Sequence, residues 1–341
     1  MQQRRAVRAR VHRFDSTGEI SAGPDSLAGE EPLEIRLDGE QFSVTMRTPG
    51  NDVELIAGYL LSEGVVAEMS DIEEIDFSAG LAPDGSRNYN LALVRLRRGI
   101  WSADAAPARS VYTSSSCGIC GTAALDAVTK TSAYPLIPAS CHFDPAAPAH
   151  NHFDPAAPAH SHAEVGDDSH AEAADGPHAE VGDESHSEVT VDEDGEYRFP
   201  PLLAAARVGE LPDRLRSGQS VFDKTGGVHA AALFAVGDDP HAEPELLATR
   251  EDVGRHNAVD KVIGWAMANR DLPLSHTVLQ VSARASFELV QKSAMAGIPM
   301  MSAVSAPSAL AVEYGRSVGV TVIGFNRKGR FNVYSYPERV I

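Results

Sequence analysis

Apolar and polar residues alternate with a period of two in the early part of the chain, which predicts β-strands. The alternation runs over residues 33–37 and resumes over 42–46 after the turn-forming pair Asp38-Gly39, so a β-hairpin is predicted there. Apolar residues between Leu55 and Leu60 then share one helical face, and Gly64 is a typical helix end.

A second hairpin is predicted around Asp84-Gly85, with its return strand at residues 91–94. These elements predict a small N-terminal α+β unit over residues 28–109, with residues 1–27 as a flexible tail ahead of it.

Beyond residue 250 the pattern changes to short apolar strands that alternate with helices. The predicted elements are helices at 259–267, 287–294 and after Pro307, and strands at 278–281, 299–304, 320–325 and 331–336. Such alternation favours right-handed crossovers and a mostly parallel sheet with helices on both faces. The sequence therefore predicts an α/β fold with a three-layer domain over residues 110–341.

A low-complexity acidic segment interrupts that domain at about residues 140–197. Residues 142–150 recur as 152–160, and residues 162–170 recur with one change as 178–186. The stretch 142–196 holds fifteen Asp and Glu and eight His but no Lys or Arg, so we expect it to be disordered and to act as a spacer rather than as a metal site.

The acidic segment also accounts for most of the net charge of −19. Without its fifteen carboxylates the remainder of the chain carries −4, which gives no support to nucleic-acid binding. No stretch of about 20 apolar residues predicts a membrane span, and the basic start lacks the apolar run of a secretory signal. With three cysteines, an odd number, we expect reduced thiols and a cytoplasmic protein.

Two of the cysteines form the C-x-x-C pair Cys117 and Cys120, set among Ser and Gly residues. Such a pair is typical of a redox couple, half of a zinc site, or a thiolate that accepts and passes on sulfur. Zinc fits poorly because a structural site needs two more ligands and Cys141 stands alone. The order of residues also excludes zinc-dependent deamination, because the H-x-E triplets follow the cysteines. We therefore expect no zinc.

Ligands of open α/β sheets bind beyond the carboxyl ends of the strands. Three polar loops are predicted there: residues 282–286 with Arg284, the serines Ser302, Ser305 and Ser308, and residues 326–330. Arg and Lys beside helix N-termini suit phosphate or pyrophosphate, whereas each loop taken alone also fits ordinary helix capping.

Residues 250–261 are unusually rich in charged groups for the start of a helix. His256 and Asp260 are four residues apart, so the carboxylate can orient the imidazole, or the charges can simply stabilise the helix. His229 follows the pair Gly226-Gly227, which allows a ligand to come close to the backbone; a buried structural histidine is the alternative.

Taken together, these motifs resemble one known family, the formate dehydrogenase accessory sulfurtransferases, or FdhD family. The matching motifs are residues 33–36, 48–52 through 63–64, Ser116-Cys117-Gly118-Ile119-Cys120-Gly121, 226–230, 251–261, 282–288, 305–308 and 324–325. They occur in family order and cover about residues 30–340 apart from the acidic segment.

The resemblance implies a cytidine-deaminase-like fold without zinc chemistry, and a sulfurtransferase that uses a cysteine persulfide. Sulfur would come from an IscS-type cysteine desulfurase, with Cys117 as carrier and Cys120 as its partner. The acceptor would be the molybdenum bis(molybdopterin guanine dinucleotide) cofactor of formate dehydrogenase. Residues 325–330 correspond to the family's cofactor-binding segment, and a homodimer is implied.

Combined with the loops and histidines described above, the resemblance yields a set of expected cofactor-binding residues. They are Phe325, Asn326, Arg327, Lys328, Gly329, Arg330, Arg284, Ser305, His229 and His256. Two other functions stay open at this point: a thiol-disulfide oxidoreductase, and a non-enzymatic chaperone for the molybdenum cofactor.

Overall fold

The computed structural model describes residues 4–18, 20–80, 85, 89–102, 129–137, 189–191 and 197–341. Cys117, Cys120 and nearly all of the acidic segment lie outside these ranges, so the predictions about them stay predictions. No helix in the described ranges is both long and apolar enough to pass through a bilayer.

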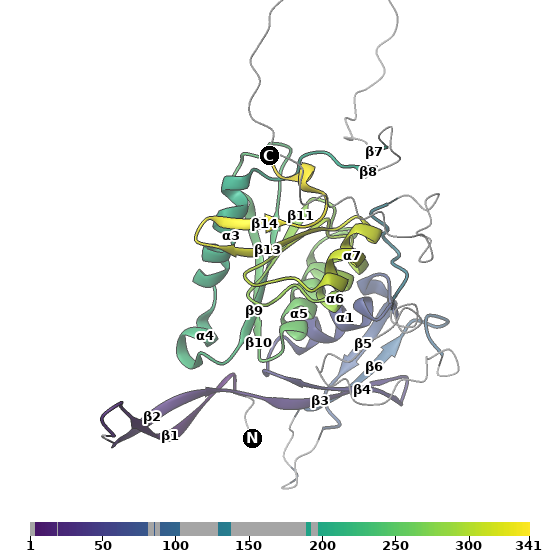
Figure 1. The fold of residues 1–341 in the computed structure, drawn as a ribbon. Helices are drawn as coiled ribbons and strands as arrows, with labels where there is room; N and C mark the ends of the chain where they lie inside the picture. Colours follow the sequence, from purple (N-terminus) through teal and green to yellow (C-terminus); the bar gives the residue numbers. More distant parts are fainter. Residues whose placement is uncertain are drawn as a thin grey trace, which may run out of the picture.

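The centre of the molecule is a mixed six-stranded sheet (Figure 1). In spatial order its strands are β10 (Glu245–Asp252), β9 (His229–Ala235), β11 (Thr277–Val281), β12 (Met300–Ala303), β13 (Thr321–Arg327) and β14 (Arg330–Val333). Strands β11, β12 and β13 are parallel, whereas the other neighbouring pairs are antiparallel. The prediction of a mostly parallel sheet is wrong because hairpin connections without a crossover helix join β9 to β10 and β13 to β14.

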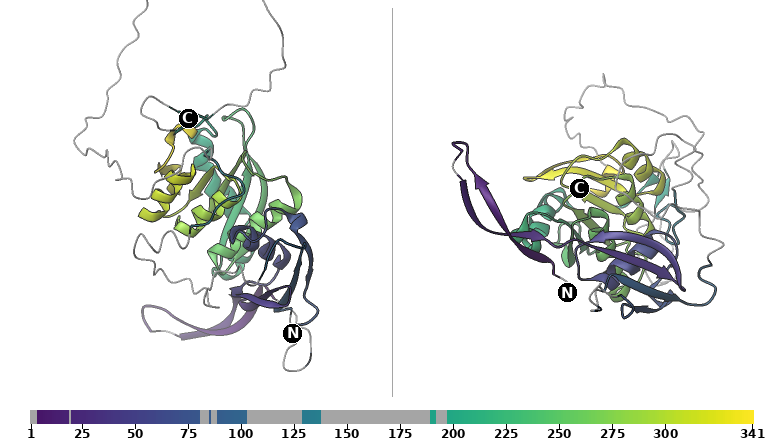
Figure 2. Two further views of the ribbon diagram at one scale, coloured as in Figure 1. Left: turned by 90° about the vertical axis from the view of Figure 1, so that its right-hand side faces the viewer. Right: turned by 90° about the horizontal axis from the view of Figure 1, so that it is seen from below.

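Helices cover both faces of this sheet, so the domain has three layers (Figure 2). They are α3 (Ala205–Ser217), α5 (Arg255–Asn269), α6 (Phe287–Met295) and α7 (Ala309–Val318). Successive strand residues point to opposite faces, so Leu233 packs in the core with α5 and α6, and Phe234 packs with α3. The predicted helices at 259–267, 287–294 and after Pro307 are confirmed as α5, α6 and α7.

The N-terminal unit is a four-stranded sheet with one long helix. Its elements are β3 (Glu31–Leu37), β4 (Glu40–Arg47), α1 (Asp52–Ser62), η1 (Met69–Asp71), β5 (Ile72–Asp76) and β6 (Leu91–Leu96), in the sheet order β4-β3-β6-β5. The β3–β4 hairpin and α1 are confirmed. Strands β5 and β6 are antiparallel as predicted, but most of the turn between them lies outside the described residues.

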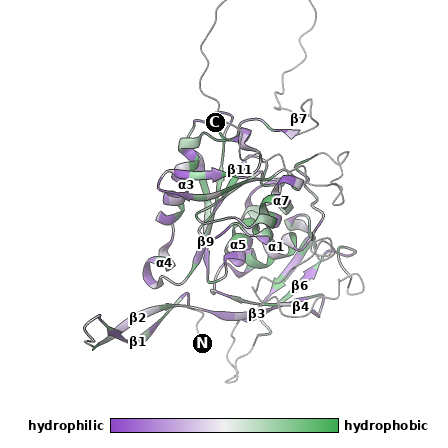
Figure 3. Ribbon diagram, in the orientation of Figure 1, coloured by the Kyte–Doolittle hydropathy of each residue, from purple (hydrophilic) through white to green (hydrophobic). Residues whose placement is uncertain are grey.

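Helix α1 lies directly on the outer side of α5, and two glycines make this close approach possible. A Cβ atom on Gly58 would lie 1.9 Å from the carbonyl oxygen of Asp260, and one on Gly264 would lie 1.8 Å from that of Glu54. Because α5 is enclosed by α1 on one side and by the sheet on the other, one hydrophobic core extends from Leu33 to Val322. Figure 3 shows the hydrophobic character of the sheet strands β9 and β11.

The first residues form an antiparallel hairpin rather than the predicted flexible tail. Strands β1 (Ala6–Phe14) and β2 (Ile20–Ala28) pair along their whole length, and the hairpin projects from the body beside α4 (Ser220–Thr225) (Figure 1). The alternation of Val7, Ala9 and Val11 with polar residues carries this strand signal, although the basic composition of the segment suggested a tail.

Three short elements complete the described fold. Strands β7 (Thr190–Val191) and β8 (Tyr197–Arg198) precede α3, and η3 (Pro337–Arg339) lies near the C-terminus. The buried guanidinium of Arg339 stacks 3.6 Å from the centre of the Phe199 ring and donates to the carbonyl oxygen of Gly319 at 2.6 Å. Burial lowers the pKa of Arg339 to about 10, so this side chain stays charged and fastens the end of the chain.

Candidate functional site

The loops predicted to bind a ligand meet at one edge of the six-stranded sheet, where the parallel strands end. The loop after β11 joins the loop after β12 through a bridge between Ala285 and Pro307. The next link is a hydrogen bond of 3.1 Å from the backbone N–H of Phe325 to the carbonyl oxygen of Ser305. His229 lies at the same edge because β9 runs antiparallel to β11 and begins there.

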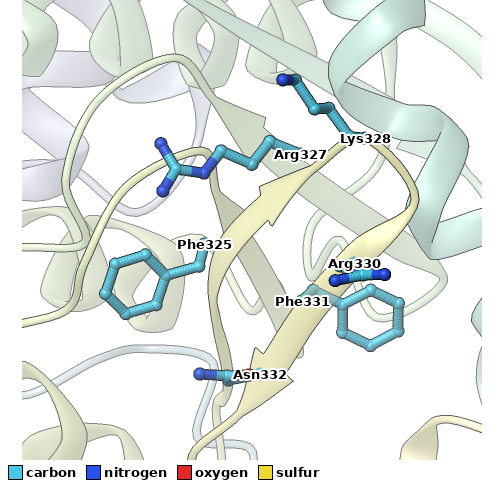
Figure 4. Close-up of a pocket in the computed structure, with 6 residues that line it drawn as sticks. All are labelled: Phe325, Arg327, Lys328, Arg330, Phe331 and Asn332. Atoms are coloured by element: carbon cyan, nitrogen blue, oxygen red, sulfur yellow. The ribbon is translucent and has the colours of Figure 1, made fainter.

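At this edge the β13–β14 hairpin bears a hollow of about 630 Å³ (Figure 4). The residues that line it are Phe325, Arg327, Lys328, Arg330, Phe331 and Asn332. The hairpin turns through Lys328 and Gly329, whose φ angles of 53° and 68° match a turn with two left-handed residues. Of the six predicted binding residues at 325–330, four therefore line the hollow, and Gly329 shapes its turn.

Phe325 holds an unusual backbone conformation at the entrance to this hairpin. Its φ of 55° is in the left-handed region, and the pairing register of β13 and β14 shifts between Gly324 and Arg327. A bulge of this kind redirects a side chain, and it leaves the Phe325 ring 37% exposed instead of packed in the core. Such conformations cost free energy and concentrate at functional sites.

The cations of the hollow are available to a ligand. In the part of the chain that the structure describes, the side chains of Arg327, Lys328 and Arg330 make no ion pair or hydrogen bond. Guanidinium groups bind phosphate through two parallel N–H donors, and aromatic rings such as Phe325 and Phe331 offer flat faces to a planar base. The combination suits a ligand that carries both phosphate and a heterocycle.

Asn326 does not line the hollow, although it was predicted to bind the cofactor. Its side chain is fully buried on the other side of the strand, where Nδ2 donates to the carbonyl oxygen of Val208 at 2.7 Å and to Oγ of Ser302 at 2.9 Å. Asn326 therefore links β13 to α3 and β12, and Ser302 is likewise a buried structural residue. Strand alternation explains this, because Phe325 and Arg327 face outward and Asn326 faces inward.

His256 lies at the start of α5, but Asp260 is not its partner. The carboxylate near His256 belongs to Glu288 in the first turn of α6, with 3.4 Å between Nε2 and Oε2. The contact with His256 lowers the pKa of Glu288 to about 2, against the raising effect of burial. At 3.4 Å the contact is an ion pair rather than a well-aligned hydrogen bond.

The other charged groups of residues 250–261 form a buried network. Lys261 Nζ lies 2.7 Å from Oδ2 of Asp252 and donates to the carbonyl oxygen of Thr48 at 2.8 Å. Lys292 Nζ donates to both carboxylate oxygens of Asp260, at 2.7 and 2.9 Å. Burial raises the pKa of Asp252 and lowers that of Lys261, and the attraction between the two opposes both shifts. The two pairs join β10, α5 and α6, and the bond from Lys261 to Thr48 ties the N-terminal unit to α5.

His229 is half-buried, opposite Asp252 in the β9–β10 pair. Its pKa is lowered, first by burial and then by the positive charges of Arg255 and His256, while Asp252 opposes the shift. Arg284 is exposed and Ser305 is half-buried on the loops between His229 and the hollow. The fold thus brings all predicted binding residues except Asn326 to one edge.

Sequence reasoning missed Arg255 and Glu288, which the structure adds to this edge. Both lie within segments that were singled out, but their proximity depends on how α5 and α6 pack. Cys117 and Cys120 lie outside the described residues. Within the described residues, no group of three or more His, Cys, Asp or Glu is placed to hold a metal ion.

Comparison with known proteins gives consistent matches over nearly the whole chain. The model of the FdhD/NarQ family matches residues 28–151 and 158–341. A protein of Streptomyces coelicolor named "Sulfur carrier protein FdhD" is 45% identical over 323 residues, which are 95% of this chain and 92% of that protein. A protein of the same name from Sulfolobus acidocaldarius is 33% identical over 329 residues, 95% of this chain and 94% of that protein.

One solved structure has a similar fold. It is a crystal structure from Desulfotalea psychrophila, of a protein assigned as a formate dehydrogenase accessory protein. The TM-score is 0.57 with 18% identity, and the alignment covers 98% of this chain and 99% of the other. At that identity the likeness supports the fold alone. The family model and the curated relatives carry the assignment, and they show that this chain belongs to the FdhD/NarQ family.

Proposed function

We propose that this protein is a sulfur carrier that acts in the maturation of formate dehydrogenase. It accepts sulfur from an IscS-type cysteine desulfurase as a persulfide on Cys117, with Cys120 as the neighbouring thiol. The sulfur then passes to the molybdenum bis(molybdopterin guanine dinucleotide) cofactor, which is bound as substrate. We further propose that the protein works in the cytoplasm as a homodimer and that its fold is related to that of cytidine deaminases.

The observation that carries this proposal is the agreement of the curated relatives. Proteins between 33% and 45% identical over more than nine-tenths of the chain share the name of a sulfur carrier. The sequence supplies the C-x-x-C pair that such a role needs, because the thiolate of a cysteine is the group that attacks a sulfur–sulfur bond.

The chemistry of loading is a thiol exchange. The Cys117 thiolate attacks the terminal sulfur of the donor's persulfide, the sulfur–sulfur bond of the donor breaks, and the donor cysteine leaves as a thiolate. Cys117 then carries one extra sulfur. A later attack by Cys120 on the inner sulfur would form a disulfide and expel hydrosulfide, which is one way to empty the carrier.

The hollow on the β13–β14 hairpin supports a nucleotide-bearing substrate. Arg327, Lys328 and Arg330 can hold pyrophosphate, and Phe325 and Phe331 can pack against guanine. Arg284, Ser305, His229 and His256 extend this proposed surface along the edge. In this proposal Asn326 keeps its place in the core and supports the hairpin.

The test is to incubate the full chain with a cysteine desulfurase and cysteine and to measure its intact mass. We expect an adduct of one sulfur that reducing agent removes and that is lost in Cys117→Ala. Cys141→Ala is the matched control, since it removes the third cysteine and should leave the adduct unchanged. An adduct that persists in the double variant Cys117→Ala/Cys120→Ala would rule out the persulfide.

The same variants separate the two other functions. If the double cysteine variant still activates formate dehydrogenase in cells, the protein is a cofactor chaperone. If the wild-type chain reduces insulin disulfides and takes up no sulfur, the cysteine pair is a thiol-disulfide couple.

A further inference from the structure

The first turn of α5 has the opposite charge to the one that a helix start favours. The positive end of the helix dipole stabilises acidic side chains there, yet α5 opens with Arg255 and His256 and has no acid in its first turn. Like charges at this point cost free energy in the isolated protein. Departures of this kind from local rules are expected at functional sites.

A third basic side chain, the imidazole of His229, lies close to these two from the sheet. His229 opens β9 and pairs with Asp252, three residues before Arg255. Burial lowers the pKa of His229, and the nearby charges of Arg255 and His256 lower it further. Three side chains that can each carry a positive charge therefore converge from β9 and α5, which lie side by side (Figure 1).

The acids that face this cluster are committed to other groups. Oδ1 of Asp252 accepts from the backbone N–H of Gly254 at 2.9 Å and from Nδ2 of Asn257 at 3.0 Å. Its other oxygen, Oδ2, accepts from the backbone N–H of Thr48 at 3.0 Å and contacts Lys261. Glu288 contacts His256.

Among the described residues, no acidic side chain forms an ion pair with Arg255. Its Nε is buried and has no acceptor within the described part of the chain, and the buried hydroxyl of Ser286 at the start of α6 has no partner in full hydrogen-bonding geometry. A buried donor without an acceptor destabilises the folded protein, so an acceptor supplied by a ligand would restore the missing hydrogen bond.

We propose that Arg255, His256 and His229 form a binding site for a phosphate group, separate from the hollow on the β13–β14 hairpin. Guanidinium and imidazolium donors together with free N–H groups at a helix start are the usual ligands of this anion. The inference rests on the proposed function only for the source of the phosphate, which is the pyrophosphate of a nucleotide-bearing substrate or free phosphate.

The site is already shaped before any ligand arrives. The buried carboxylate of Asp252 holds the turn that leads into α5, and Thr48 Oγ1 accepts from the backbone N–H of Val253 at 3.1 Å. The ion pair with Glu288 fixes His256 against α6. A preorganised turn lowers the ordering cost of binding.

The first test measures thermal unfolding of the full chain in phosphate-free buffer with added inorganic phosphate, pyrophosphate or GDP. We expect the midpoint of the wild-type protein to rise with each anion, because a ligand that binds the folded state stabilises it. In Arg255→Gln, at least tenfold more phosphate should be needed for the same rise. Without anion, this variant should be at least as stable as wild type, because a cation has left the helix start.

Arg270→Gln is the matched control, since Arg270 is exposed at the other end of the same helix. It should keep the wild-type response. Stronger effects of pyrophosphate and GDP than of phosphate identify the source as a nucleotide, and equal effects identify it as free phosphate. A response to inorganic phosphate that is undiminished in Arg255→Gln, or no rise in wild type with phosphate and pyrophosphate, overturns the site.

A second measurement does not depend on the folding of any variant. In the wild-type protein, NMR titration should show the pKa of His229 rising when inorganic phosphate is added, because the anion offsets the charges of Arg255 and His256. An unchanged pKa at saturating phosphate contradicts the proposal. Both measurements are independent of Cys117, so failure of the phosphate site and failure of sulfur loading are told apart.

Discussion

Charged residues of this protein fall into two groups according to whether the fold satisfies them. The pairs Asp252–Lys261 and Asp260–Lys292 are buried and join β10, α5 and α6. Hydrogen bonds from these groups to Thr48 and Ser62 connect them to the N-terminal unit. Arg327 and Arg330 are exposed and unpaired within the described residues. Because a buried charge is tolerated only when it is paired, the first group serves the fold, and the second is available for binding.

The ion pair of His256 and Glu288 predicts a dependence of stability on acid. The pKa of Glu288 is lowered from 4.5 to about 2, so its contribution is fully present above pH 4.5 and is lost as the pH falls towards 2. In Glu288→Gln, the loss of stability between pH 4.5 and 2 should be smaller than in wild type. Because Glu288 is about half exposed, solvent screening keeps the difference small.

Thermal or urea unfolding at pH 7, 5 and 3 measures this effect. Glu313→Gln is the control, since Glu313 is exposed on α7 and has no ion pair within the described residues. If both variants lose stability with acid in parallel with wild type, the contact with His256 does not stabilise the ionised carboxylate of Glu288.

Among the elements, α1 and α5 cross in close backbone contact. Gly58 lets the backbone of α1 touch that of α5 at Asp260, so any side chain at this position must push the helices apart. The same contact brings Ser62 within 2.9 Å of the Asp260 carboxylate. Backbone proximity and the buried charge network therefore depend on one another.

Gly58→Ala should destabilise the protein by about 3 kcal/mol. The gain of about 1 kcal/mol in helix propensity is outweighed by the clash of the new Cβ with a backbone oxygen, which no side-chain rotation can relieve. Urea unfolding measures the change.

Gly237→Ala is the matched control, because a Cβ there meets nothing within 4 Å; it should change stability by no more than about 0.5 kcal/mol. A tolerated Gly58→Ala would mean that the helices are not in such close contact.

Elements differ in how strongly the sequence pattern predicts them. Strand β3 and helix α5 were predicted because their apolar residues follow periods of 2 and 3.6. Helix α3 and strands β9 and β10 were not predicted. The run Ala230–Ala232 in β9 has little β-propensity by composition, and burial between two layers of helices makes it a central strand.

At the scale of the whole molecule, the N-terminal unit and the three-layer domain share one hydrophobic core. Leu60 of α1 and Val262 of α5 belong to the same cluster as Leu279 of the central sheet. The boundary predicted at residues 109 and 110 lies outside the described residues and stays a prediction. A shared core of this size favours cooperative unfolding of both parts together.

The two tryptophans of the chain test this. Trp101 packs on Phe42 in the N-terminal unit, and Trp265 lies on α5. In Trp101→Phe and Trp265→Phe, the remaining tryptophan reports on one part alone. For each variant, unfolding is followed by both fluorescence and circular dichroism. The midpoint of the fluorescence transition should coincide with the midpoint of the circular-dichroism transition, which reports on the backbone. A fluorescence midpoint that departs from the backbone transition would show that the two parts unfold separately.

The sequence by itself determined the family, the cysteine pair and the kinds of element, because motifs and hydrophobic periods are local properties of the chain. It also indicated the sheet edge, since polar loops after parallel strands must meet there. Tertiary structure alone decided that Glu288 and not Asp260 faces His256, that Asn326 turns into the core, and that Arg255 joins His229. Each depends on how separate elements pack and face one another, and residue spacing within one segment contains no information about a partner in another.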